Sequence, residues 1–420
     1  MAPIDWISNN EIPRPLTAAL AALRFDEPST AALEQLNDDE WWECLDTCDR
    51  GRLTLLLAES AADAMPEAVA ERVERNLVDN RRRLWRLEDD YLQIALQLGS
   101  AQLDHVLLKG FAQEPAFAPD RSRRPQYDLD LYFRGASIHR ARDVIADLGY
   151  ESMSGQRTTN VDHLPAMIKP TGWHWQEDYF DAEIPTIVEL HFQLWDEPTE
   201  RIAVPGIEDL WDRRTTRDLS GRSVPVFAPA DQLGYSALHV LRHMLRGDVR
   251  AFHVYELAYF LDNHEEDYAL WGQWSDLYHP YFRALQCVPL LLAHAWFGCR
   301  LPRVVSEHAA LFPDSVHHWF DRYGVSLLST TFQPNKDELW LHLSLLKRFP
   351  DKLHVMRRRL FPLTLPGPVD GVFVRPEEQS LKARMAKLAR YILHTAHRAA
   401  FHLRSLVSAV RNGFEWWFRW

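Results

Sequence analysis

The chain has 420 residues, of which 46% are hydrophobic and 25% charged, and its formal net charge at pH 7 is −12. This composition is ordinary for a globular protein built from two or three structural units. The negative charge argues against a general nucleic-acid coat protein, because phosphate binding needs exposed positive charge. A local basic groove remains compatible with it.

The N-terminal region, residues 1–100, is predicted to be helical. Apolar positions recur at spacings of three and four residues over 18–23, 29–36 and 39–57, and 67–98 is predicted as one long helix. Stripes of this kind usually mark faces that pack into a core. We therefore expect the region to support the rest of the chain rather than to carry a separate activity.

Residues 101–200 alternate between predicted strands and helices. The stretch 124–133 is predicted as a strand that carries Asp128 and Asp130 on one face, because successive strand side chains point to opposite faces. Two carboxylates held this close repel each other unless a cation lies between them, and a divalent metal ion is the usual solution. The pair is therefore a candidate metal site.

Two further strands extend this pattern. An apolar strand upstream ends in Lys109 and Gly110, and a strand downstream carries Glu189 and His191 on its polar face. Two aspartates, a later acidic strand residue and an earlier strand that ends in glycine fit metal-dependent nucleotidyl transfer.

Between these strands, 137–148 is predicted as a helix that stops at Gly149. The next segment, 158–183, is rich in His and Trp and has no clean period. Long irregular segments inside a compact domain are often lids or binding loops. A plain hairpin is the equally good alternative.

Residues 201–361 are predicted to form a helical domain. The helix at 230–245 carries His239 and His243 four residues apart, and therefore on one face. The pair could bind a metal ion, but no glutamate follows His239 as a metalloprotease helix requires. We expect the two histidines to form hydrogen bonds within a polar helix seam or to face the active site.

Residues 362–420 are predicted to be a linker, rich in proline and glycine over 362–376, followed by a basic amphipathic helix. Eight Lys and Arg side chains stand against one acid in 381–420, so this segment carries +7 and the preceding 380 residues −19. Its apolar stripe consists of Leu381, Met385, Leu388, Ile392, Leu403, Leu406 and Val410. The helix could dock on an anionic membrane surface or clamp an acidic partner or a nucleic acid. We favour folding back onto the acidic body, with the stripe buried there.

The four cysteines do not form a disulfide framework, and Cys44 and Cys48 are predicted to share a buried helix face. The N-terminus has neither a basic start nor an apolar run, so no signal peptide is expected. The longest apolar stretch, 288–293, is too short to span a bilayer. A reduced, cytoplasmic setting is the expectation.

The segment from Leu108 to Tyr150 resembles a family of uncharacterised bacterial nucleotidyltransferases, which belong to the DNA polymerase β type. The matching motifs are Leu108-Lys109-Gly110, Arg124, Asp128-Leu129-Asp130, Leu148-Gly149-Tyr150 and Glu189-Leu190-His191. This resemblance implies an α+β fold, with a small mixed nucleotidyltransferase sheet and flanking helices embedded between helical N- and C-terminal regions. The catalytic core is expected at 101–200.

The resemblance also implies a separate role for each residue of the site. The expected ligands of Mg²⁺ or Mn²⁺, which would also be the catalytic residues, are Asp128, Asp130 and Glu189. Binding of the nucleoside triphosphate is assigned to Lys109, Gly110 and Arg124. His191 is expected to orient Glu189 or the acceptor.

The implied reaction moves a nucleoside monophosphate from a nucleoside triphosphate such as ATP to an unidentified acceptor and releases pyrophosphate. The acceptor could be a small molecule, a peptide or protein side chain, or an RNA end. One alternative is a binding or scaffolding protein without turnover that uses its basic tail, since Tyr127 stands where the family has a small residue. Another is a toxin-like transferase that modifies tRNA.

Overall fold

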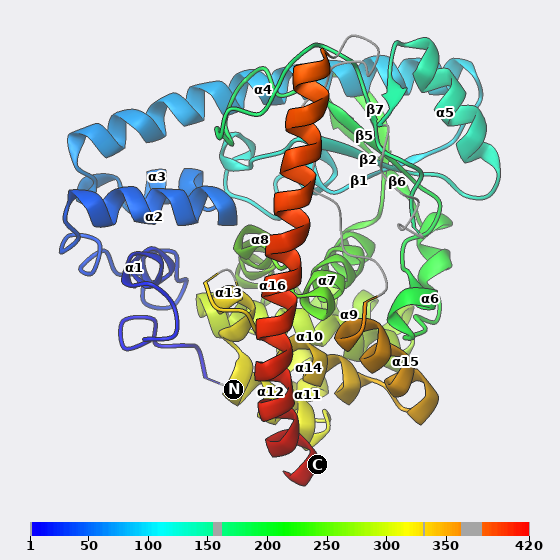
Figure 1. Cartoon of the computed structure of the whole chain (residues 1–420). Helices are drawn as coiled ribbons and strands as arrows, with labels where there is room; N and C mark the ends of the chain where they lie inside the picture. The colour runs from blue at the N-terminus through cyan, green and yellow to red at the C-terminus, as the bar shows by residue number, and fades with distance from the viewer. Residues whose placement is uncertain (1, 154–161, 331, 363–379, 420) are drawn as a thin grey trace.

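The computed structural model describes residues 2–153, 162–330, 332–362 and 380–419 (Figure 1). The helices before the central sheet are α1 (Arg14–Ala22), α2 (Asp38–Gly51), α3 (Thr54–Ser60) and α4 (Glu67–Ser100). The long helix α4 agrees with the single helix predicted for this stretch. The predicted burial of Cys44 and Cys48 is confirmed, since both lie in the core within α2.

Two helix predictions in the N-terminal region are wrong. Residues 29–36 form turns instead of a helix, because Asn37 and Glu40 make a capping box that begins α2 at Asp38. The stretch 39–57 is two helices, since Arg52 takes a left-handed conformation with φ 63° and ends the first one.

A five-stranded mixed sheet forms the centre of the α+β fold, as predicted. Its strands are β1 (Val106–Leu108), β2 (Asp128–Tyr132), β3 (Glu151–Ser152), β4 (Met167–Ile168) and β5 (Ile187–His191). The strand order is β1-β2-β5-β4-β3, and β2 and β5 pair in parallel while the other pairs are antiparallel. A separate hairpin consists of β6 (Thr215–Leu219) and β7 (Arg222–Val226).

The two faces of the sheet meet different partners (Figure 1). One face carries apolar residues such as Leu129 and Val188, which pack with α4 and with α5 (Ser137–Asp147) in one hydrophobic cluster. The other face carries Asp128, Asp130 and Glu189 and is turned toward α7 (Pro229–Arg246) and α8 (Ala251–Asn263). The alternation of side chains along β2 thus separates the core from the polar site.

The C-terminal half is helical except for the β6–β7 hairpin. The prediction of a helical region over 201–361 is therefore wrong at 215–226, where the turn at Ser220 and Gly221, both with positive φ, lets two strands pair. Besides α7 and α8 the helices of this half are α6 (Glu197–Glu200), α9 (Tyr268–Leu277), α10 (Pro280–Phe297), α11 (Arg303–Ala309), α12 (Asp314–Tyr323), α13 (Ser326–Ser329), α14 (Glu338–Leu345) and α15 (Phe349–Leu360). A second, larger hydrophobic cluster joins these helices to α1, α2 and α3. The boundaries predicted at residues 100, 200 and 361 stay predictions.

The last helix is α16 (Leu381–Arg419), and most of the predicted linker lies outside the described residues. Its second half docks on the body through Ser405, Ala409, Asn412 and Trp416, which are buried. The prediction that the apolar stripe is buried there is wrong, because the helix docks through a different face. Within the described ranges, no helix combines the length and apolarity that a membrane crossing needs.

Candidate functional site

The candidate site lies on the polar face of the two parallel strands. In the register of β2 and β5, Asp130 lies opposite Glu189, and Tyr132 lies opposite His191. Parallel neighbours lie about 4.8 Å apart, so side chains from opposite positions on one face can share a ligand. The strand pairing therefore brings together two carboxylates that are far apart in the sequence.

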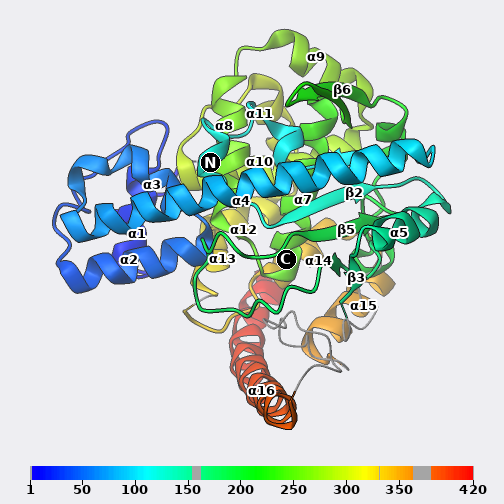
Figure 2. The same ribbon diagram turned by 90° about the horizontal axis from the view of Figure 1, so that it is seen from above.

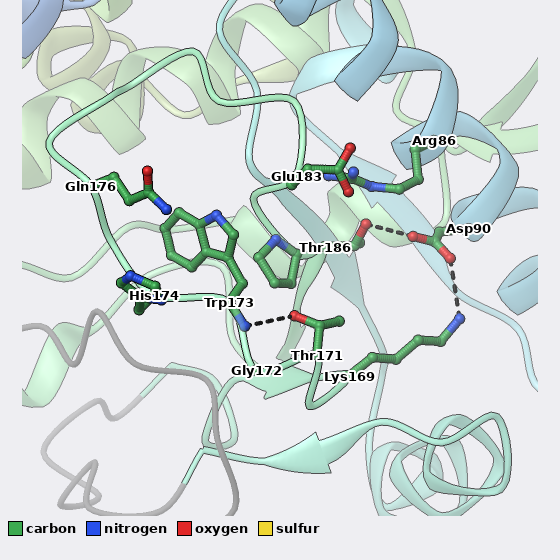
Figure 3. Close-up of a pocket in the computed structure, with 11 residues that line it drawn as sticks. Arg86, Asp90, Lys169, Thr171, Gly172, Trp173, His174, Gln176, Glu183 and Thr186 are labelled. Atoms are coloured by element: carbon green, nitrogen blue, oxygen red, sulfur yellow. Dashed lines mark hydrogen bonds and ion pairs between the residues drawn. The ribbon is translucent and has the colours of Figure 1, made fainter. Parts of the chain in front are cut away.

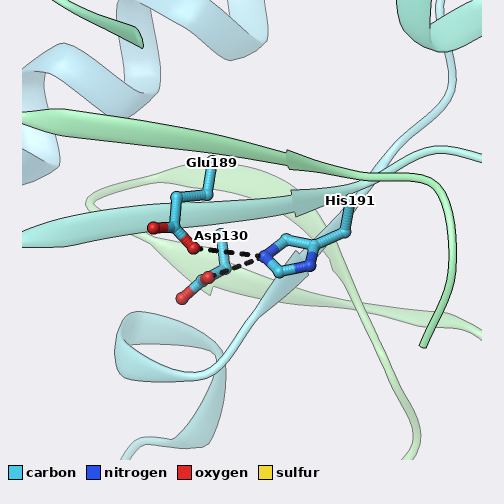
Figure 4. Close-up of side chains that lie close together, drawn as sticks. All are labelled: Asp130, Glu189 and His191. Atoms are coloured by element: carbon cyan, nitrogen blue, oxygen red, sulfur yellow. Dashed lines mark hydrogen bonds and ion pairs between the residues drawn. The ribbon is translucent and has the colours of Figure 1, made fainter. Parts of the chain in front are cut away.

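Asp130, Glu189 and His191 converge from these strands (Figure 4). Nε2 of His191 lies 2.9 Å from Oδ1 of Asp130 and 3.6 Å from Oε2 of Glu189. One potential ligand atom from each of the three residues lies within 4.8 Å of the other two. The two carboxylate oxygens suit a divalent cation as ligands, and the His191 imidazole lies beside both of them.

The charges in this cluster compensate one another. Burial raises the pKa of Asp130, but the ion pair with Lys109 and the hydrogen bond from His191 outweigh burial and hold that pKa well below its usual range. Burial lowers the pKa of His191, but its contacts with Asp130 and Glu189 outweigh burial and raise it to about 9. At neutral pH a carboxylate pair thus faces a protonated imidazole.

Lys109 reaches the same cluster from the end of β1. Its Nζ lies 3.0 Å from Oδ2 of Asp130. Burial lowers the pKa of Lys109, but the charge on Asp130 and other nearby acidic groups outweighs burial and raises it. The Lys109 backbone has φ 51° and ψ −172°, a conformation that residues other than glycine rarely adopt. The ion pair is therefore held by a strained backbone.

Gly110 follows with φ +50°, and a Cβ atom there would lie 2.4 Å from the Gln126 side chain. Gln126 is buried, and its Nε2 donates a hydrogen bond to the carbonyl of Asp128 at 2.9 Å. The absence of a side chain at Gly110 thus leaves room for the Gln126 side chain to bind the Asp128 backbone. The predicted approach of Gly110 to nucleotide phosphates stays a prediction.

Asp128 shares a strand face with Asp130 but is outside the three-residue cluster found among the described residues. Burial, and next the negative charge of Asp130, raises the pKa of Asp128. The preceding residue, Tyr127, lies between two guanidinium groups, with Arg52 at 4.5 Å and Arg83 at 4.3 Å from its ring centroid. Its hydroxyl donates to the Tyr179 carbonyl at 2.7 Å, so Tyr127 fixes the start of β2.

Arg124 is buried in an ion pair with Glu256 of α8, with 2.6 Å between Nε and Oε1. Burial raises the pKa of Glu256 in spite of Arg124. This pair links the segment before β2 to the helical half of the chain. The role predicted for Arg124 in nucleotide binding stays a prediction.

Histidines of α7 and α8 form the wall opposite the sheet. The ring centroids of His239 and His243 lie 4.5 Å apart, and that of His253 lies 5.3 Å from His239. His239 and His253 line a small cavity together with Lys109. The structure shows both placements predicted for His239 and His243. His239 faces the site, while Nη2 of Arg242 lies 3.4 Å from Nδ1 of His239 and Nδ1 of His243 lies 2.9 Å from Oδ1 of Asp248.

Sequence reasoning missed other members of this wall. Arg242 of α7 donates to Asp162, and the Asp162 carbonyl accepts from the backbone amide of Phe192 directly after β5. Arg242 follows His239 by three residues and therefore shares its helix face. That spacing was the signal which could have identified it.

A larger pocket, with a volume of about 550 Å³, opens where α4 meets the start of β5 (Figure 3). It is lined on one side by Arg86 and Asp90 of α4 and on the other by Trp173 and His174. Lys169 lies 3.2 Å from Asp90. The described part of the segment predicted as a lid or a hairpin thus forms a pocket wall, with only the short strand β4 in it.

Comparison with known families agrees with this geometry. Residues 37–298 match the model of a family described as uncharacterised nucleotidyltransferase. Neither the comparison with curated proteins nor that with solved structures gives a match. The matched range contains the whole sheet and every residue of the candidate site.

Proposed function

The chain belongs to the uncharacterised nucleotidyltransferase family, and we propose that it transfers a nucleoside monophosphate from a nucleoside triphosphate to an acceptor. The acceptor attacks the α-phosphorus, the bond from that phosphorus to the bridging oxygen breaks, and pyrophosphate leaves. The observation that carries this proposal is the convergence of Asp130, Glu189 and His191 on two parallel strands within a chain of this family.

The residues present fit a divalent metal ion such as Mg²⁺ or Mn²⁺. Carboxylate oxygens are the ligands that these ions prefer, and in this structure two cationic side chains, Lys109 and His191, balance Asp130. We assign Asp128, Asp130 and Glu189 as the ligands. The chemistry that such ions supply is neutralisation of charge on the phosphoryl oxygens and activation of the acceptor.

The remaining steps fall to the side chains of the protein. Glu189 is the proton acceptor in this proposal, and 28% of its side chain is exposed, so an acceptor molecule can approach it. His191 positions Glu189 and Asp130 through Nε2. Lys109 holds Asp130 in this structure and, in the proposal, pairs with a phosphate oxygen once the triphosphate is bound.

A binding experiment tests this function. Purified protein is mixed with labelled ATP, GTP, CTP and UTP with and without Mg²⁺, and pyrophosphate release is followed with candidate acceptors. We expect Mg²⁺-dependent binding of at least one nucleotide, weakened by a factor of about 10 to 100 in Asp130→Asn and Glu189→Gln. Asp143→Asn is the matched control, since Asp143 is exposed on α5 and forms an ion pair with its neighbour Arg142 on the surface.

If no nucleotide binds in the presence of Mg²⁺, or if Asp130→Asn binds and turns over as the unmodified protein does, the site is not a nucleotidyltransferase centre. Nucleotide binding without turnover for any small-molecule, peptide or RNA acceptor would instead support a binding protein that keeps the fold.

A further inference from the structure

Helix α16 presents an apolar face to solvent between Leu381 and Phe414. The exposed large apolar side chains on this face are Leu381, Met385, Leu388, Ile392, Leu403, Val407, Val410 and Phe414. Figure 2 shows the first part of the helix extending away from the body. Large exposed apolar stripes mark interaction surfaces, because soluble proteins rarely leave them uncovered.

The stripe is straight. Together with Ala396 and Ala399, its positions recur at steps of four, three and four residues, which is an 11-residue repeat. This repeat corresponds to about 3.67 residues per turn and keeps the stripe on one side of a nearly straight helix, whereas left-handed coiled coils repeat every seven residues. At about 1.5 Å per residue, the 39 residues of α16 extend over about 58 Å. A long straight stripe matches a flat partner.

The contacts that hold α16 on the body leave the stripe free. The Asn412 side chain donates to Asp337 at 2.7 Å, and the Trp416 ring stacks on Trp340 with 6.0 Å between centroids. Ser405 and Ala409 are buried on the same side. At about 100° per residue, this docked side points more than about 80° away from most of the apolar stripe.

The positive charge of α16 indicates which kind of flat partner fits this stripe. The helix carries eight Lys and Arg side chains and one acid, and Lys382, Arg404 and Arg411 lie along one edge of the stripe. A second copy would bring another helix of charge +7 against the first, which is repulsive. An anionic lipid surface supplies both hydrocarbon for the stripe and negative headgroups for the basic edge.

We propose that α16 is a membrane-surface anchor. The helix lies in the plane of an anionic bilayer, its stripe enters the boundary between headgroups and acyl chains, and its docked half holds the nucleotidyltransferase body at that surface. This inference is independent of the proposed function, since it rests on α16 alone.

Vesicle co-sedimentation of the full-length protein tests the proposal. Vesicles of phosphatidylcholine alone are compared with vesicles that contain phosphatidylglycerol, at low and high salt. We expect binding to the anionic vesicles at low salt and its loss at high salt. The double variants Leu388→Gln/Ile392→Gln and Lys382→Glu/Arg404→Glu should each weaken binding by about tenfold or more.

The matched control replaces exposed apolar residues elsewhere, Tyr268→Gln and Leu311→Gln, which are 83% and 82% exposed. This control should bind vesicles as the unmodified protein does, and thermal unfolding should show that all variants remain folded. Absence of binding to anionic vesicles overturns the proposal. So does a stripe variant that converts a dimer to a monomer in sedimentation velocity without changing vesicle binding, because the stripe would then cover a second copy.

Discussion

Glu189 lies opposite Asp130 in the parallel register of β2 and β5. The imidazole of His191 contacts both carboxylates, and Lys109 holds Asp130 from the other side. The site therefore exists as a balanced cluster of two negative and two positive groups. Substitutions in and around the cluster therefore have predictable effects.

Lys109 provides a test of backbone strain. The Lys109 backbone has φ 51°, a conformation that only glycine adopts without strain. The free energy of unfolding of Lys109→Gly should therefore exceed that of Lys109→Ala by about 1 to 2 kcal/mol. Both variants lose the ion pair to Asp130, so their difference isolates the backbone. Urea denaturation measures it. Equal stability, or the order found at ordinary positions where alanine is better, would show that Lys109 is not strained.

Gly110 tests the close approach of Gln126. Gly110→Ala should lower the free energy of unfolding by more than about 2 kcal/mol, because the added methyl group meets the buried Gln126 side chain and displaces its hydrogen bond to Asp128. Gly135→Ala is the control, since Gly135 also has a positive φ but nothing within 4 Å of its Cβ position. Similar losses in the two variants would argue against this contact.

The buried pair between Arg124 and Glu256 should be important for stability. Glu256→Gln leaves the Arg124 charge uncompensated and should cost about 3 to 5 kcal/mol in the free energy of unfolding. The exposed pair between Arg303 and Glu307 is the control, and Glu307→Gln should leave the free energy of unfolding nearly unchanged. Chemical denaturation compares the two. A Glu256→Gln variant as stable as the control would contradict the assignment.

Acid should destabilise the protein through His239. Burial, and next the charge of Lys109, lowers the pKa of His239 well below its ordinary value, so the native state keeps it neutral. The unfolded chain takes up the proton below about pH 6.5. Stability due to this group is therefore complete above that pH and falls below it by up to about 1.4 kcal/mol per pH unit.

The measurement is the slope of the free energy of unfolding between about pH 5 and 6.5, in the range set by the ordinary histidine pKa. His239→Gln should reduce that slope, whereas His139→Gln, at an exposed position, should not. Identical slopes in the unmodified protein and in His239→Gln would mean that His239 does not stay neutral in the folded state.

Local periodicity predicted the elements that position the site. Alternation identified β2 and β5, and the helical stripe identified α4 to within two residues of its end. Both patterns follow from the geometry of a single element, so they can be recognised without knowledge of its neighbours. Asp130 and Glu189 were predicted to lie close enough to share a metal ion. In the structure a carboxylate oxygen of each lies within 4.8 Å of the other.

Contacts between distant elements could not be predicted in the same way. Arg124 and Glu256 are 132 residues apart, and no periodic pattern relates them. The docked side of α16 was missed because its buried residues include Ser405 and Asn412, which are polar, while the more apolar stripe stays exposed. The hydrophobic pattern of the sequence predicts that the most apolar face of a helix is buried. In α16, however, small and hydrogen-bonding residues form most of the contact with the body.

We propose that the carboxylates of β2 and β5 form a divalent cation site. Titration of the full-length protein with Mn²⁺, followed by electron paramagnetic resonance of the free ion, tests this without knowledge of the acceptor. We expect saturable binding that weakens by about tenfold or more in Asp130→Asn and remains unchanged in Asp143→Asn. Equal Mn²⁺ binding by the unmodified protein and Asp130→Asn would contradict it.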